Sequence, residues 1–149
     1  MEEIKKEDLE NYLNGVYQNI RTAVQSIDEL LPKVKDNNLK KELASEQDVY
    51  IALQKECEVF SQAEKLEKIK DNNWLEKAKL WSSINLSTMT NKTTRHIAEM
   101  MLFGTFMGYI TCVKDLYDHK NISKEIDDIL TRLKEFERKN LDALMPYLV

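Results

Sequence analysis

The chain has 149 residues, 42% of them hydrophobic and 32% charged, and its 22 basic and 26 acidic residues give a net charge of −4 at neutral pH. This length and apolar content suit one domain over residues 1–149, and the interspersed charges exclude the basic stripe that nucleic-acid binding requires. With only three glycines and two prolines, the composition favours long helices over a sheet, and we predict an all-α fold.

The first predicted helix covers residues 8–34. Apolar residues recur there at steps of three and four, which draws one stripe along a helix, and Pro32 should bend or stop it. The residues before it are charged at nearly every step and carry no apolar core or cleavage site, so no signal peptide is indicated. We therefore expect a cytoplasmic protein.

The second predicted helix runs from Leu39 through about Lys68, after a polar turn at Asp36-Asn37-Asn38 that supplies a capping residue. Its apolar stripe includes Cys57 but also a carboxylate, Glu46, at a position that the periodicity assigns to the core. Cys57 and Cys112 lie far apart without the paired spacing of a metal or redox motif, so buried free thiols are favoured over a disulfide.

A break at residues 70–73 precedes a shorter amphipathic helix, predicted from Trp74 to about Met89. Trp74 and Trp81 share one of its faces, which would cap the end of the bundle or form a partner surface.

The third long helix follows cap residues at 91–94 and is the most apolar, with no charged residue from Met100 to Val113. This run is shorter than the roughly 20 residues that span a bilayer, so a buried helix is favoured over a transmembrane one, and no membrane partner is expected. Because it is apolar around most of its circumference, it should pack on more than one neighbour or on another subunit. We therefore predict a homodimer.

The last predicted helix is capped at residues 121–123 and has its stripe over residues 126–148, with an irregular last turn at Pro146. Two polar residues, Glu137 and Asn140, fall on its inner face. Together with Glu46 they predict a polar layer in the centre of a four-helix bundle, which is where bundles bind metals.

The helix order, the position of the crossover and the segment from Ile97 to Gly108 resemble the ferritin-like superfamily. The resemblance implies a four-helix bundle with a short extra helix between helices two and three. It also implies a Glu-x-x-His pair on helices two and four and one Glu on each of helices one and three. The pairs read Glu46-Gln47-Asp48-Val49 and Glu137-Arg138-Lys139-Asn140, and no carboxylate stands near Gly15 or Gly104, so the implied metal centre is degenerate.

Glu46, Glu137 and Asn140 have two interpretations. A hydrogen-bonded core cluster without a cofactor is favoured, because buried carboxyls must share a proton, bind a cation or find donors. The alternative is that they hold one iron or manganese ion. No nucleophile–base arrangement or phosphate-binding glycine loop accompanies them, so we favour a non-catalytic structural or protein-binding role over a residual metal oxidoreductase or storage protein.

The three glycines, Gly15, Gly104 and Gly108, all lie inside helical patterns. Each costs roughly 0.8 to 1 kcal/mol relative to alanine there, and the usual compensation is that a second helix, a ligand or a partner subunit approaches the backbone closely. We therefore predict close helix packing at all three. In the ferritin-like arrangement Gly15 and Gly104 stand beside the absent glutamates, and our hypothesis is that helices one and three close together there and fill the former cavity.

Overall fold

The computed structural model describes residues 5–67 and 91–149, and no strand occurs in these ranges. Within these ranges the chain forms four long helices, and a 3₁₀ turn follows the first and the last of them: α1 Lys6–Leu30, η1 Leu31–Lys33, α2 Asn37–Ala63, α4 Thr94–Asp118, α5 Lys124–Leu144 and η2 Met145–Leu148. The predicted all-α fold is confirmed. The helix predicted between Trp74 and Met89 lies outside the described residues.

The predicted capping segments do start the helices. The side chains of Asp36, Thr93 and Ser123 accept hydrogen bonds from backbone N–H groups of the first turns of α2, α4 and α5, at 2.9, 3.2 and 3.2 Å. Pro32 lies in η1 and stops α1 at Leu30. α2 ends at Ala63, before the predicted Lys68, because Lys65 has a left-handed φ of 54°.

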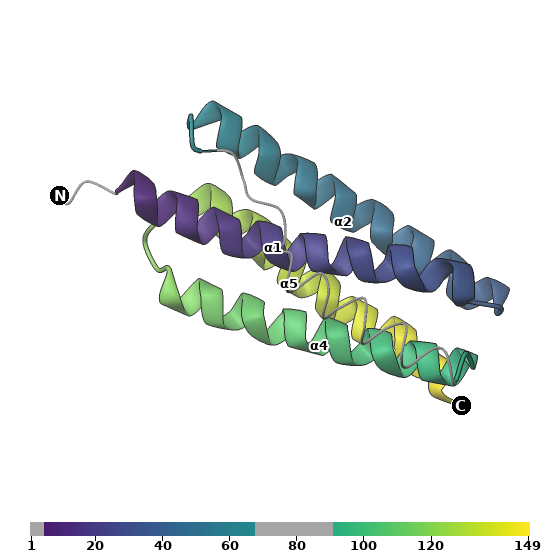
Figure 1. Ribbon diagram of the computed structural model, residues 1–149. Coiled ribbons are helices and arrows are strands. Elements are labelled where there is room, and N and C mark those ends of the chain that lie inside the picture. The colour runs from purple at the N-terminus through teal and green to yellow at the C-terminus, as the bar shows by residue number, and fades with distance from the viewer. Residues whose placement is uncertain (1–4, 68–90) are drawn as a thin grey trace.

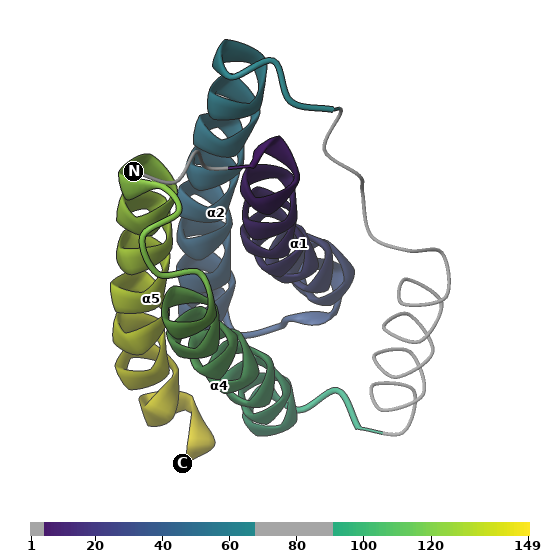
Figure 2. The ribbon, with the colours of Figure 1, turned by 90° about the vertical axis from the view of Figure 1, so that its left-hand side faces the viewer.

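Neighbouring helices run antiparallel (Figure 1). α1 packs against α2 and α4, and α5 packs against α4 and α2. α2 and α4 run in the same direction on opposite corners of the bundle, so α2 ends and α4 begins at opposite ends of the molecule. Seen from one end, the four helices surround a common core (Figure 2).

The core is built from the predicted stripes. Its fully buried large side chains come from all four helices: Tyr12, Leu13, Ile20, Ile27, Leu30, Leu39, Leu43, Tyr50, Ile97, Ile126, Leu130 and Leu133. At one end, the Tyr12 hydroxyl donates to Asp127 Oδ1 at 2.5 Å, and the Tyr12 ring stacks on His119 with centroids 4.5 Å apart. These contacts tie α1 to the end of α4 and the start of α5.

α4 is only partly a core helix. Its inner face is buried, but only 33% of its most apolar 18-residue stretch is buried inside the bundle. By length and composition alone, α4 is the one helix in the described ranges that could cross a membrane. A core helix passes the same test, and α4 packs against α1, α5 and η2. The prediction that α4 has more apolar surface than the bundle core covers is confirmed by its exposed side chains: Phe103, Phe106, Met107, Val113 and Tyr117.

Candidate functional site

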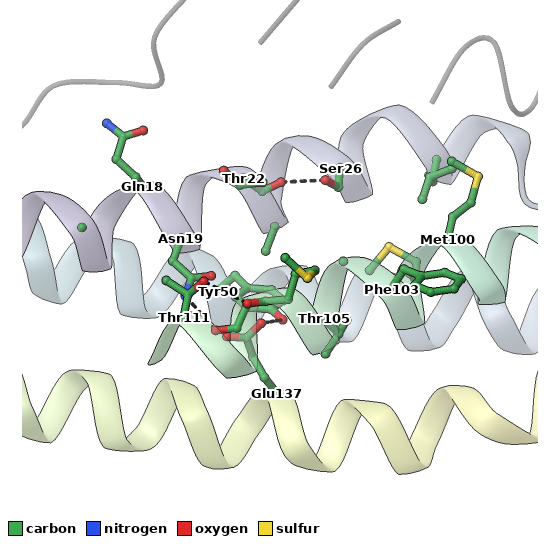
Figure 3. Close-up of a pocket in the computed structure, with 17 residues that line it drawn as sticks. Gln18, Asn19, Thr22, Ser26, Tyr50, Met100, Phe103, Thr105, Thr111 and Glu137 are labelled. Carbon is green, nitrogen blue, oxygen red and sulfur yellow. Dashed lines mark hydrogen bonds between the residues drawn. The ribbon is translucent and has the colours of Figure 1, made fainter. Parts of the chain in front are cut away.

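All four helices contribute to a buried polar cluster in the middle of the bundle. Figure 3 shows Asn19, Tyr50 and Glu137 of this cluster. Asn140 Nδ2 on α5 donates to the Tyr50 hydroxyl on α2 at 3.4 Å, and that hydroxyl donates to Glu137 Oε2 at 3.5 Å. The thiol of Cys112 on α4 donates to Glu137 Oε1, also at 3.5 Å. Asn19 on α1 completes the cluster, since its Nδ2 donates to Gly108 O at 3.1 Å and to Cys112 Sγ at 3.5 Å.

Glu137 is a buried acid in its neutral form. Its side chain is 1% exposed, and burial raises its pKa to about 8, although the two hydrogen bonds from Cys112 and Tyr50 lower it. Both hydrogen bonds are long, so they stabilise a carboxylate weakly. At pH 7 the carboxyl is therefore mostly protonated.

Glu46 lies one turn before Tyr50 on α2 and is buried without a donor. Neither of its carboxyl oxygens accepts a hydrogen bond in the described part of the chain. Burial is the largest cause that raises its pKa, to about 9, followed by the carboxylate of Glu42 one turn earlier, to which a protonated Glu46 can donate. Glu137, which ionises at a lower pH than Glu46, adds to the upward shift of the Glu46 pKa through its negative charge. Glu46 is therefore also neutral at pH 7.

The three predicted site residues do not all meet. Glu137 and Asn140 both bond to Tyr50, whereas Glu46 bonds to neither of them. Among the described residues no three His, Cys, Asp or Glu side chains come together in a group that could hold a metal ion.

Gly108 is the glycine that permits a close approach. A Cβ atom placed on it would collide with Glu137 Oε2 and would lie 3.0 Å from Asn19 Oδ1. The Glu137 carboxyl thus occupies the place of the missing side chain, and two oxygens from α5 and α1 converge beside Gly108. The predicted close packing is correct here, and its reason is a side chain rather than a helix backbone.

The other two glycines do not behave as predicted. Gly104 is exposed, and no heavy atom of the described residues lies within 4 Å of a Cβ placed there, so the prediction of close packing is wrong at Gly104. At Gly15 the nearest atom is Asp115 Oδ2 at 3.4 Å, which is an ordinary side-chain contact. The hypothesis that α1 and α4 close over the former cavity at Gly15 and Gly104 also fails, because both residues line an open groove.

This groove lies between α1 and α4 and has a volume of about 610 Å³ (Figure 3). Met100, Phe103 and Met107 form its apolar wall on α4, and Tyr50 and Glu137 lie at its floor. Among its lining residues in the described ranges, Glu137 is the one carboxyl and none is Lys, Arg or His. The volume falls within the usual range of small-molecule sites.

The cluster lacks an activated nucleophile. Burial, with the charge of Glu137 as the next cause, raises the pKa of the Cys112 thiol, and burial also raises the pKa of the Tyr50 hydroxyl. A thiol that stays protonated is a poor nucleophile.

Sequence reasoning missed Asn19, the role of Cys112 and the groove itself. Asn19 stands beside the apolar stripe of α1, and nothing in the periodicity distinguishes it from an ordinary surface amide.

Comparison of the chain with protein-family models, with curated proteins and with solved structures finds no match.

Proposed function

We propose that this protein is a non-catalytic, protein-binding helical bundle that associates with itself through the outer side of α4. One observation carries the proposal, namely the apolar stripe formed by Phe106, Val113 and Tyr117, which are 49, 46 and 70% exposed. Their spacing places them on one face, about 17 Å long at 1.5 Å per residue. A contiguous exposed apolar face of this kind is typical of an interaction surface.

A two-fold dimer brings the same surface of both copies together, so a second copy can cover this outer stripe with its own. In a two-fold dimer whose α4 helices cross antiparallel, each end of the stripe meets the opposite end in the partner. Phe106 of one copy then lies near Tyr117 of the other, and the two apolar stripes cover each other.

The test is the mass in solution, measured by size-exclusion chromatography with light scattering at micromolar concentration. We expect twice the monomer mass for the natural protein and the monomer mass for Phe106→Glu and Val113→Glu, because a buried unpaired charge is costly. Val59→Glu is the matched control, since Val59 is 65% exposed on α2, away from the stripe. A natural protein that is monomeric at this concentration would refute the proposal.

We further propose a ferritin-like bundle with a degenerate metal centre. The antiparallel neighbours, with α2 and α4 parallel on opposite corners, support this arrangement. The alternative function, residual iron or manganese binding by Glu46 and Glu137, is favoured by one observation, the two Glu46 oxygens without donors. Elemental analysis of protein purified without chelators distinguishes the two, and we expect neither metal at stoichiometric amounts.

A further inference from the structure

The groove between α1 and α4 combines an apolar body with a single acid at its floor. Phe103 and Met107 are 74 and 62% exposed on its α4 wall, while Glu137, at 1% exposed, lines the same groove from below. Apolar walls with a small number of placed polar groups are the usual composition of a ligand site.

Gly108 lets this acid pack at the wall of the groove. A side chain at Gly108 would occupy the place of the Glu137 carboxyl, and a side chain at Gly104 would project into open space that now belongs to the groove. The stretch of α4 beside Glu137 therefore carries no side chain at Gly104 or Gly108, and the Glu137 carboxyl packs on the α4 backbone where Gly108 lines the groove.

Two oxygen acceptors converge at this point. A Cβ on Gly108 would meet Glu137 Oε2 and Asn19 Oδ1, so both oxygens lie beside Gly108, and all three residues line the groove. The Nδ2 of Asn19 is already used by Gly108 O and Cys112 Sγ, which fixes the amide with its oxygen turned toward Glu137. Two acceptors from different helices suit a donor with several N–H groups, such as an ammonium group.

We propose that the groove binds a small organic cation, a protonated amine whose nitrogen sits between Glu137 and Asn19 and whose apolar part lies along Met100, Phe103 and Met107. Charge complementarity selects this occupant over an anion, because the described lining holds one carboxyl and no basic residue. The aromatic ring and the thioethers of the wall also suit the carbon chain of such a ligand. The groove wall and the outer stripe lie next to each other on α4, but each proposal is tested by variants of its own, so either can fail alone.

The probe is n-hexylamine, with hexan-1-ol and hexanoate as matched neutral and anionic compounds, titrated by calorimetry into the full-length protein. We expect hexylamine to bind at least about tenfold more tightly than either, because a charge-assisted hydrogen bond in a buried site is strong. At pH 7 binding should release close to one proton, measured in buffers of different ionisation enthalpy, as Glu137 becomes ionised. Tyr50 and Cys112, the titratable groups that contact Glu137, have raised pKa values and stay protonated.

Three variants locate the site. Glu137→Gln should abolish the proton release and weaken binding about tenfold or more. Gly104→Leu should block the apolar part of the groove without disturbing the fold, because a Cβ there meets no described atom. Glu46→Gln is the control, since this equally buried acid does not line the groove, and the affinity should stay within about twofold.

Equal affinity for hexan-1-ol would identify a neutral apolar occupant and overturn the cation site. Absence of hexylamine binding, or unchanged proton release in a folded Glu137→Gln protein, would overturn it as well. If Glu137→Gln does not fold, the proton release of the natural protein and the Gly104→Leu result still decide the matter.

Discussion

Alanine substitutions at Gly104 and Gly108 should change stability in opposite directions, although the two residues are one turn apart on α4. In a helix interior alanine is favoured over glycine by about 0.8 to 1 kcal/mol. At Gly104 the new methyl group meets no described atom. Gly104→Ala should therefore raise the free energy of unfolding by about 1 kcal/mol and the Tm by roughly 3 °C.

At Gly108 the same methyl group collides with the carboxyl of Glu137. Both Glu137 Cδ and Asn19 Oδ1 would lie 3.0 Å from it, so the carboxyl has to move away from Tyr50 and Cys112. Overpacking of a buried site costs about 1 to 3 kcal/mol, which exceeds the helix-propensity gain. We expect Gly108→Ala to lower the free energy of unfolding by about 1 kcal/mol.

The assay is urea unfolding followed by circular dichroism, at one fixed protein concentration because self-association makes apparent stability concentration-dependent. A double-mutant cycle isolates the cause. In a Glu137→Ala background the collision is removed, so Gly108→Ala should become stabilising there, as Gly104→Ala is in the natural protein. If Gly108→Ala is as stabilising as Gly104→Ala without that second change, the Glu137 carboxyl is free to move and the close approach has no structural role.

The remaining predictions concern the buried acids and thiols. Glu46 and Glu137 have folded-state pKa values of about 9 and about 8, above their usual 4.5, so the folded state binds more protons than the unfolded state between these limits. The free energy of unfolding should thus fall as pH rises from 5 to 8, by up to about 1.4 kcal/mol per pH unit for each acid. Glu46→Gln should reduce that slope in urea titrations, and an unchanged slope would contradict the burial argument. Burial raises the pKa of Cys57 to about 12 and raises that of Cys112, so both thiols should react with a disulfide reagent only in urea, and rapid native labelling would refute this.

The helices and the inward polar residues follow from the sequence, because both depend on local patterns. A period of three and four residues placed Glu46, Glu137 and Asn140 on inner faces, and all three are buried. The polar capping residues Asp36, Thr93 and Ser123 lie in the segments that predicted where α2, α4 and α5 begin. The contacts among the polar residues did not follow, because they depend on the relative register of α1, α2, α4 and α5. Periodicity in one helix carries no information on that register, and it gave no reason to pair Asn19 with Cys112.

The apolar residues of α4 are distributed over three faces, and the sequence pattern alone does not distinguish these faces. A helix that is apolar all round predicts burial all round, yet α4 has one buried face, one groove wall and one outer stripe. Large side chains such as Phe106 and Tyr117 suit a flat partner surface, whereas Gly104 and Gly108 beside Phe103 leave room for something small. The large side chains of the outer stripe therefore suit a protein partner, and the part of α4 that contains the glycines suits a small ligand. A substitution on the outer stripe should alter the mass in solution without altering amine binding, and Gly104→Leu should do the reverse.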